Sequence, residues 1–289
     1  MCDSCVRAVT VIAGAGRRGV ELGLGTVRRV TRRRADTLLA ERGLAASRTA
    51  AAATVRAGRV RLGKDGSTVE KPSELVPEDA ELVVDDSQEF VSRGGIKLEN
   101  ALTELGVDVD GRLCLDVGAS TGGFTDCLLQ RGAKMVIAVD VGYGQLDWRL
   151  RQDSRVLVME RLNARHLGDS SLPFRPELIT VDVSFISLAM LIPSIVATAA
   201  SEFDLLGLVK PQFELAKEKV GKGGVVRDAA DRRDAIRRVA EAAQTQGLVV
   251  RALASSGLPG PKGNRETFVW AARSGKAVDL DAALEEVEP

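Results

Sequence analysis

Four charged residues, Lys97, Asp182, Lys210 and Glu266, are of types that together could remove a proton from a weak nucleophile. Each lies at the start or the end of an expected helix or strand, in positions that can face one edge of a single sheet. In such a neutral cluster, partial burial and a neighbouring cation can lower the pKa of a lysine until it acts as a base. A ribose 2'-hydroxyl needs a base of this kind. Taken singly, each residue has a plainer interpretation as a surface cation, half of a structural ion pair or a charge at a strand edge.

A glycine-rich turn, Gly118-Ala119-Ser120-Thr121-Gly122-Gly123, follows the expected strand at 113–117 and leads into an expected helix. Glycines let a ligand approach the backbone, and the first turn of a helix offers unpaired N–H groups. A dinucleotide site would need a second glycine at the pyrophosphate position, which this turn lacks. Asp116 precedes the turn, where a carboxylate attracts an amino group and repels a pyrophosphate. The turn therefore favours S-adenosylmethionine as the cofactor, and methyl transfer over hydride transfer.

Two later polar residues could complete the cofactor site. Asp140 closes the next expected strand, 22 residues after Gly118, where an acid can accept hydrogen bonds from both ribose hydroxyls. Its alternative is an acidic residue in a surface turn. Asn163 follows the third strand and could bind the adenine edge or equally cap a turn. The predicted cofactor-binding residues are Asp116, Gly118, Ser120, Gly122, Phe124, Asp140 and Asn163.

Strand-like apolar runs alternate with helical segments after residue 111. The expected strands are 113–117, 135–139, 156–159, 178–183, 205–209, 248–253 and 267–271, and the expected helices include 91–105, 123–131, 188–200 and 230–246. This alternation predicts an α/β fold with a parallel, Rossmann-like sheet covered on both faces. Ligands of such sheets bind at the carboxyl ends of the strands, and Asp140, Asp182 and Lys210 each close one of them.

The segment before residue 85 predicts a small α+β domain. A helix is expected from Thr31, with an apolar stripe and an end at Gly43, and a second helix is expected between Ser47 and Gly58. Short strands are expected at 60–62 and 81–84.

Residues 28–71 hold twelve Lys or Arg against four Asp or Glu, whereas the whole chain is neutral. A basic module on an acidic body suits a protein that binds phosphate, although a solvated helix face is the alternative. The predicted RNA-binding residues are Arg32, Arg33, Arg34, Arg48, Arg56, Arg59 and Arg61.

Several classes of protein are disfavoured by the composition. Cys114 and Cys127 fall within an expected strand and helix, where they are typical of small buried hydrophobic residues. Cys2 and Cys5 have the spacing of half a zinc site, but His166 is the only histidine, so no metal is expected. No apolar run is long enough for a signal peptide or a membrane helix, so a cytoplasmic location is expected and no membrane partner.

Residues 33–48 and 58–63 resemble the S-four RNA-binding domain, in which two helices present basic residues to structured RNA. Seven further blocks between residues 91 and 266 resemble the TlyA family. They are VSRGGIKL at 91–98, LDVGASTGGFT at 115–125, DVGYGQL at 140–146, DVSFISL at 182–188, LVKPQFE at 208–214, GKGGVVRD at 221–228 and PGPKGNRE at 259–266.

The resemblance implies an S-adenosylmethionine-dependent enzyme that methylates the ribose 2'-oxygen of cytidine in ribosomal RNA, with ribosomal RNA or subunits as partners and no DNA. It implies an FtsJ-like catalytic tetrad at Lys97, Asp182, Lys210 and Glu266. Lys210 would be the base, oriented by Asp182 and Glu266, with Lys97 near the substrate hydroxyl.

The expected organisation has five parts: a disordered extension at 1–27 that has no counterpart in the family, an S-four domain at 31–85, a linker at 86–92, an FtsJ-like methyltransferase domain at 93–273 and a tail at 274–289. Some members of the family are also called haemolysins, so one alternative is a membrane-active haemolysin. Another alternative is a ribosome-binding module whose methyltransferase fold is degenerate. The absence of a spanning segment disfavours the first, and the intact tetrad disfavours the second.

Overall fold

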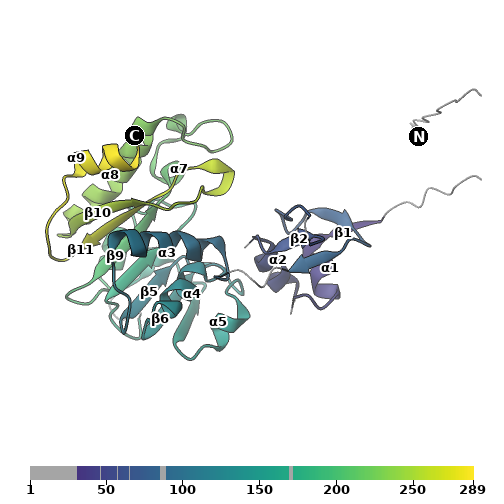
Figure 1. Cartoon of the computed structure of the whole chain (residues 1–289). Coiled ribbons are helices and arrows are strands. Elements are labelled where there is room, and N and C mark those ends of the chain that lie inside the picture. Colours follow the sequence, from purple (N-terminus) through teal and green to yellow (C-terminus); the bar gives the residue numbers. More distant parts are fainter. Residues whose placement is uncertain (1–30, 46, 57, 65, 85–88, 169–171) are drawn as a thin grey trace, which may run out of the picture.

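The computed structural model describes residues 31–45, 47–56, 58–64, 66–84, 89–168 and 172–289. The chain forms a small amino-terminal unit and a larger α/β unit (Figure 1). The expected extension at 1–27, with Cys2 and Cys5, lies outside the described residues. Within the described residues, no helix combines the length and the apolar character that a membrane span requires.

The small unit packs two helices against two short antiparallel strand pairs. Its elements are β1 (Arg32–Arg34), α1 (Ala35–Glu41), α2 (Arg48–Arg56), β2 (Val60–Leu62), β3 (Leu75–Pro77) and β4 (Leu82–Val84), with β1 paired to β3 and β2 to β4. Ser47 Oγ accepts a hydrogen bond from Ala50 N at 3.1 Å, which caps α2 as expected. Leu38, Leu39 and Val55 lie in its core.

The expected helical start at Thr31 is wrong, because residues 32–34 form β1 and the helix begins at Ala35. β3 was also not expected. Strands of three residues carry too little alternation to be recognised, and only their pairing across the fold stabilises them.

The larger unit contains a seven-stranded sheet in the order β10-β11-β9-β8-β5-β6-β7. Its strands are β5 (Leu113–Val117), β6 (Met135–Asp140), β7 (Val156–Glu160), β8 (Leu178–Val181), β9 (Asp204–Val209), β10 (Val249–Ser255) and β11 (Thr267–Ala272). The expectation of a wholly parallel sheet is wrong for β11, which pairs antiparallel with both β9 and β10. No crossover helix connects β10 to β11, and a parallel pair requires one. Thr267 therefore lies opposite Val209, at the carboxyl edge of β9.

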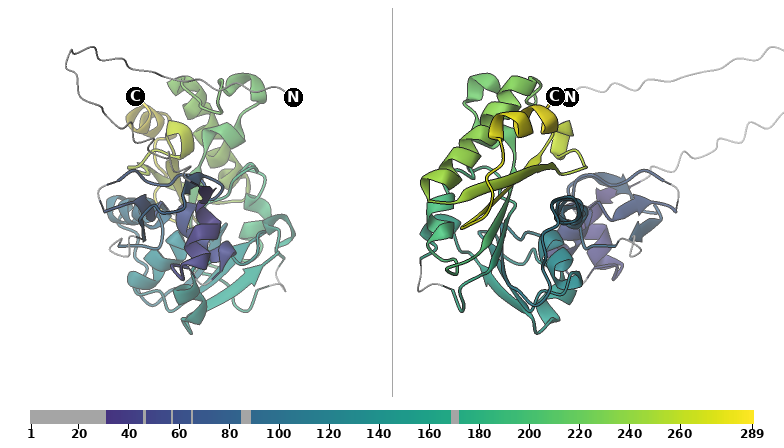
Figure 2. Two further views of the ribbon diagram at one scale, coloured as in Figure 1. Left: turned by 90° about the vertical axis from the view of Figure 1, so that its right-hand side faces the viewer. Right: turned by 60° about the vertical axis from the view of Figure 1, so that its left-hand side comes forward.

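Helices cover both faces of the sheet, as expected (Figure 2). They are α3 (Arg93–Leu105), α4 (Gly123–Gln130), α5 (Trp148–Gln152), α6 (Ile192–Val196), α7 (Pro211–Glu214), α8 (Ala229–Thr245) and α9 (Leu280–Val287), with short 3₁₀ turns η1 (Ala164–His166), η2 (Lys217–Lys219) and η3 (Pro261–Gly263). Successive residues of a strand face opposite sides, so Leu115 joins the core beneath α6 and α8 while Cys114 joins the core beneath α3 and α4. Both Cys114 and Cys127 are fully buried, as expected.

Two segments differ from the sequence expectation. The helix expected at 188–200 is only α6, and its late start follows from Pro193, which has no N–H and would clash with the preceding turn of a helix that began at 188. The segment at 274–289 is not a free tail, since it contains α9. Its Glu288 is 2% exposed and pairs with Arg232 at 2.7 Å and Arg265 at 3.3 Å.

Candidate active site

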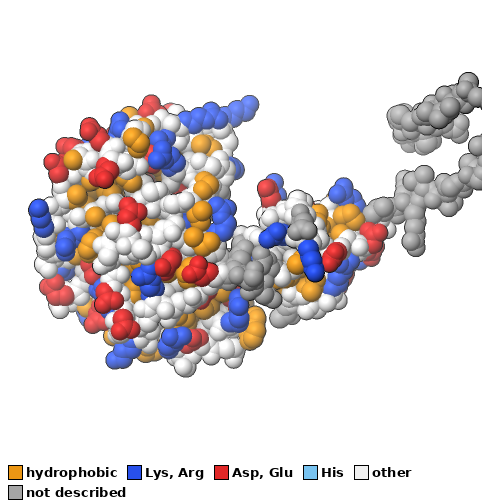
Figure 3. Space-filling model, in the orientation of Figure 1, with side chains coloured by type: hydrophobic (Ala, Val, Ile, Leu, Met, Phe, Trp, Pro, Cys, Tyr) orange, Lys and Arg blue, Asp and Glu red, His pale blue; other side chains and the backbone are white. Residues whose placement is uncertain are grey.

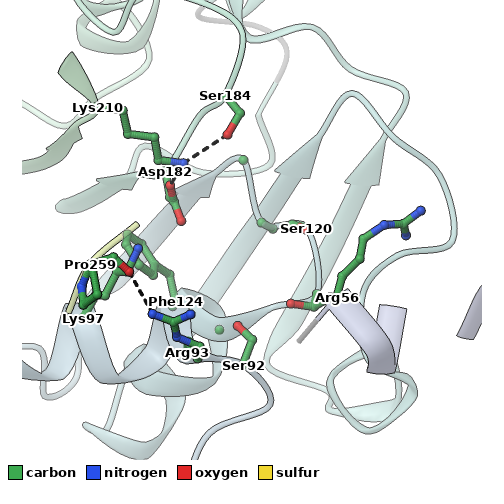
Figure 4. A pocket seen from close by; sticks show the side chains of 15 residues that line it. Arg56, Ser92, Arg93, Lys97, Ser120, Phe124, Asp182, Ser184, Lys210 and Pro259 are labelled. Carbon is green, nitrogen blue, oxygen red and sulfur yellow. Dashed lines mark hydrogen bonds and ion pairs between the residues drawn. The ribbon is translucent and has the colours of Figure 1, made fainter. Parts of the chain in front are cut away.

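Lys210 and Asp182 form an ion pair at the carboxyl edge of the sheet. Asp182 follows β8 and Lys210 follows β9, so the two parallel strands bring them together. Lys210 Nζ lies 2.5 Å from Asp182 Oδ1, and it also donates a hydrogen bond to Ser184 Oγ at 3.1 Å (Figure 4). The side chain of Lys210 is 11% exposed and that of Asp182 is 25% exposed, so the lysine amine lies at the wall of a cavity instead of in open solvent.

Lys97 and Glu266 form the second ion pair of the predicted tetrad. Lys97 lies on α3, and its Nζ donates to Glu266 Oε2 at 2.5 Å. Glu266 immediately precedes β11 and reaches this edge because β11 is antiparallel to β9. The structure thus differs from the prediction that Glu266 orients Lys210. Gly260 packs so closely on Glu266 that a Cβ there would lie 2.0 Å from Oε1.

The two pairs adjoin one cavity of about 280 Å³. Lys97, Asp182 and Lys210 line it, whereas Glu266 lies behind Lys97. The glycine turn contributes Gly118, Ser120 and Phe124 to the same wall, whereas Gly122 does not reach it. The sheet therefore brings three of the four predicted catalytic residues and part of the predicted cofactor turn to one cavity.

Gly118 is required by the close approach of two strand ends. Its φ is +88°, in the left-handed region, and a Cβ there would lie 2.4 Å from the backbone oxygen of Asp182. Ser120 is also in the left-handed region, at φ +48°. A residue other than glycine is strained in this region, and strained backbone conformations cluster at functional sites.

A second cavity of about 530 Å³ adjoins the same turn. Asp140 and Asn163 both line it. Asp140 accepts hydrogen bonds from the backbone N–H groups of Ser120 at 2.8 Å and Gly142 at 2.6 Å. Asn163 Oδ1 accepts from Arg165 N at 3.0 Å, so the turn-capping interpretation of Asn163 holds even though the residue also faces the cavity.

Asp116 lies beneath the turn and lines neither cavity. Its side chain is fully buried, and Oδ2 accepts a hydrogen bond from Thr125 Oγ1 at 2.7 Å. Oδ1 is buried and has no hydrogen-bond partner among the described residues. Burial raises the pKa of Asp116 to about 7, and the nearby Asp182 and Asp140 carboxylates add to this shift. The carboxyl is therefore poised to change its charge near neutral pH.

Three residues at the cavity were missed by the sequence reasoning, although they lie within two of the recognised blocks. Arg93 lines the first cavity and donates to Pro259 O at 2.8 Å, and Ser184 contacts Lys210. Phe185 lines the second cavity; it has φ +65° and is 92% exposed. A bulky residue in the left-handed region is unusual. The sequence carries no signal for such a conformation.

Three of the seven arginines expected to bind RNA are partly neutralised by carboxylates of the small unit. Figure 3 shows Lys and Arg side chains on that unit interspersed with carboxylates. Asp36 pairs with Arg34 at 2.7 Å and Arg48 at 3.4 Å, and hydrogen bonding from Arg34 lowers the pKa of Asp36 to about 2. Arg33 pairs with two glutamates of its own unit, whereas Arg32 is exposed.

Arg59 is not at the surface, in contrast to the prediction that it binds RNA. It is 6% exposed, and its Nη1 lies 3.4 Å from Asp147 Oδ2 in the larger unit. Arg61 is half-buried and donates to Lys64 O at 3.5 Å. Arg56 is exposed and lines both cavities.

In the part of the chain that the structure describes, no cluster of three or more His, Cys, Asp or Glu could hold a metal ion.

Comparisons with known proteins agree with this architecture. A model of the FtsJ-like methyltransferase family matches residues 90–273, and a model of the S4 domain matches residues 33–82. The 16S/23S rRNA (cytidine-2'-O)-methyltransferase TlyA of Mycobacterium tuberculosis is 48% identical over 241 residues, which are 83% of this chain and 89% of that protein. Hemolysin A of Brachyspira hyodysenteriae is 47% identical over 140 residues, which are 48% of this chain and 58% of that protein.

A solved structure from Streptococcus thermophilus, given the provisional name hemolysin, has a TM-score of 0.69 at 37% identity. The similarity spans 89% of this chain and 94% of that one. The expected combination of a methyltransferase fold with a small RNA-binding domain is thereby confirmed. The chain belongs to the TlyA family of FtsJ-like methyltransferases that carry an S4 domain.

Proposed function

We propose that the protein transfers a methyl group from S-adenosylmethionine to the ribose 2'-oxygen of a cytidine in ribosomal RNA. The proposal rests on two ion pairs that adjoin one cavity beside the glycine turn. They are Lys210 with Asp182 and Lys97 with Glu266. The names of the relatives supply the substrate, since the Mycobacterium tuberculosis protein is a 16S/23S rRNA (cytidine-2'-O)-methyltransferase. A cytoplasmic location would follow from that substrate.

The residues at the second cavity fit the cofactor. Asp140 would receive its ribose hydroxyls, Asn163 its adenine edge, and the backbone at Gly118 its amino acid moiety. The unpartnered oxygen of Asp116 would favour a cationic amino group on the other side of the turn. Ser120, Gly122 and Phe124 would shape the turn between the two cavities. When bound, S-adenosylmethionine supplies an electrophilic methyl group on a sulfonium.

Lys210, once it has released its own proton to solvent, would accept the proton of the 2'-hydroxyl on its neutral amine. Asp182 holds the Lys210 amine at 2.5 Å, which fixes its direction, and Ser184 adds a second contact at 3.1 Å. Lys97, held by Glu266, would place a positive charge near the oxygen as its negative charge develops. Phe185 exposes an aromatic face beside these residues, and such a face can stack on an unpaired base.

The S4 domain would bring the RNA to this site. Arg32, Arg33, Arg34, Arg48, Arg56 and Arg61 would supply contacts to phosphates, whereas Arg59 would hold the domain in place through Asp147.

The test uses ribosomal subunits from cells that lack the gene, incubated with the protein and S-adenosylmethionine labelled in its methyl group. We expect the label in ribosomal RNA, and in 2'-O-methylcytidine after digestion to nucleosides. Label on a base, or no transfer to either subunit, would overturn the proposal.

The hemolysin names of two relatives favour a second candidate, a membrane-active protein. This candidate predicts leakage of phosphatidylcholine vesicles without any cofactor.

A further inference from the structure

Arg56 is the last residue of α2 in the S4 domain, yet it lines both cavities of the methyltransferase domain. Its side chain is exposed, and it forms no ion pair or hydrogen bond with any other residue that the structure describes. Figure 4 shows it beyond Ser120, across the cavity from Lys210. An unpaired guanidinium at the mouth of an active site is free to bind an anion.

Contacts between the two domains determine where Arg56 lies. Three residues further along the chain, Arg59 pairs with Asp147, and the two side chains are only 7% and 13% exposed. Asp147 also accepts a hydrogen bond from Arg149 N at 2.9 Å, so the same carboxylate caps α5. A third cavity, of about 220 Å³, separates α2 from the segment 144–148 and is lined by Ala50, Ala53, Thr54, Gly144, Leu146 and Trp148. The end of α2 is thus anchored beside the cofactor cavity.

The charges around the first cavity set Arg56 apart from the two lysines, and Arg93, which also lines it, donates a hydrogen bond to Pro259 O at 2.8 Å. Glu266 neutralises Lys97, and Asp182 neutralises Lys210. Arg56 has no such carboxylate partner in the described part of the chain. A nucleotide whose 2'-hydroxyl reaches Lys210 carries a phosphate on each side of its ribose, and a guanidinium binds a phosphate with two parallel hydrogen bonds.

We propose that Arg56 binds the backbone phosphate next to the target nucleotide, so that the S4 domain contributes directly to the placement of the ribose at Lys210. This inference rests on the proposed function. The exposed position of Arg56 at the rim favours an RNA phosphate over the carboxylate of the cofactor, which the N–H groups of the glycine turn can receive more deeply.

The experiment compares Arg56→Ala, Arg56→Lys and Arg32→Ala. Arg32 is the matched control, because it is an exposed arginine of the same domain that lines none of the cavities described. Affinity for unmethylated ribosomal subunits is measured at several salt concentrations, single-turnover methyl transfer at saturating subunits, and binding of S-adenosylmethionine alone by calorimetry.

We expect both alanine variants to weaken subunit affinity about fivefold and to reduce the salt dependence by about one phosphate contact. Only Arg56→Ala should also slow single-turnover transfer, by about tenfold, because only Arg56 fixes the target nucleotide. Arg56→Lys should recover the affinity but not the rate, since an ammonium lacks the two-pronged geometry. Binding of the cofactor alone should not change.

An unchanged single-turnover rate in Arg56→Ala would overturn the inference, as would equal slowing by Arg32→Ala. Weaker binding of S-adenosylmethionine without RNA would overturn it too, because Arg56 would then be a cofactor ligand. If the wild-type protein transfers no methyl group to ribosomal RNA, the proposed function fails. The affinities would then still show whether Arg56 contacts a phosphate.

Discussion

Lys97 and Glu266 are 169 positions apart in the chain, yet Lys97 Nζ lies 2.5 Å from Glu266 Oε2. The contact exists because β11 is antiparallel, which brings the residue before it to the carboxyl edge of β9. Glu266 is 2% exposed and Lys97 is 8% exposed, so each charge depends on the other for its compensation.

Glu266→Gln should therefore cost both stability and activity. The substitution leaves the buried Lys97 ammonium without a counter-charge, and we expect the free energy of unfolding to fall by about 3 kcal/mol. A double variant, Lys97→Met with Glu266→Leu, replaces the pair by apolar groups and should recover most of that loss while remaining inactive. Denaturant unfolding and methyl transfer measure the two effects separately. Activity in the stable double variant would show that the pair is only structural.

Gly260→Ala should disable the site although it substitutes no charged residue. The added Cβ would lie 2.0 Å from Glu266 Oε1, so Glu266 must move and Lys97 loses its partner. We expect methyl transfer to fall at least about tenfold. Gly168→Ala is the control, because a Cβ at Gly168 would meet no described residue within 4 Å. Equal activity of the two variants would contradict the tight packing around Glu266.

The charge of Asp116 should control cofactor binding. Its pKa is raised to about 7, so the carboxyl is neutral below that pH and ionised above it. If the ionised form attracts the amino group of S-adenosylmethionine, affinity should rise as the pH increases through about 7. Calorimetric titrations between pH 6 and pH 8 would measure this, with Asp116→Asn as the comparison. An identical pH dependence in the variant would rule out the role of Asp116.

The same pKa makes a prediction about folding. In the unfolded chain Asp116 ionises near its ordinary pKa of 3.8, whereas in the folded protein it keeps its proton up to about pH 7. The unfolded state therefore holds fewer protons between these values, and this carboxyl makes the free energy of unfolding fall as the pH rises from about 4 to about 7. Asp116→Asn should remove that part of the pH dependence.

Glu288 should stabilise the loop that carries Glu266. It pairs with Arg265, the neighbour of Glu266, and with Arg232, whose Nη1 also donates to Arg227 O at 2.7 Å. We expect Glu288→Gln to lower the free energy of unfolding by about 2 kcal/mol and to lower activity further than lost folding explains. The exposed pair Arg237 with Asp281 also ties α9 to α8, so Asp281→Asn is the control and should do neither. Full activity of folded Glu288→Gln would contradict the role.

The sequence predicted the sheet well where its strands are buried. The apolar runs at 113–117 and 135–139 lie within one residue of β5 and β6, because a strand covered on both faces is apolar along most of its length. It also predicted that Asp140, Asp182 and Lys210 share one edge, since parallel strands end there together.

Other features depend on contacts that no local pattern carries. The partner of Glu266 follows from the direction of β11, which only pairing with β9 determines. The burial of Arg59 follows from the presence of Asp147 in the other domain, and a cluster of arginines does not reveal which one faces inward. The packing of α9 likewise depends on Arg232 and Arg265, which are distant in the chain.

The most direct measurement is single-turnover methyl transfer by Lys210→Ala on unmethylated ribosomal subunits, with subunit affinity and S-adenosylmethionine affinity measured on the same preparation. Loss of a proton acceptor should slow transfer at least about a hundredfold, while both affinities stay within about twofold of the wild type. That result would support Lys210 as the base. A variant that transfers the methyl group at the wild-type rate would contradict the account.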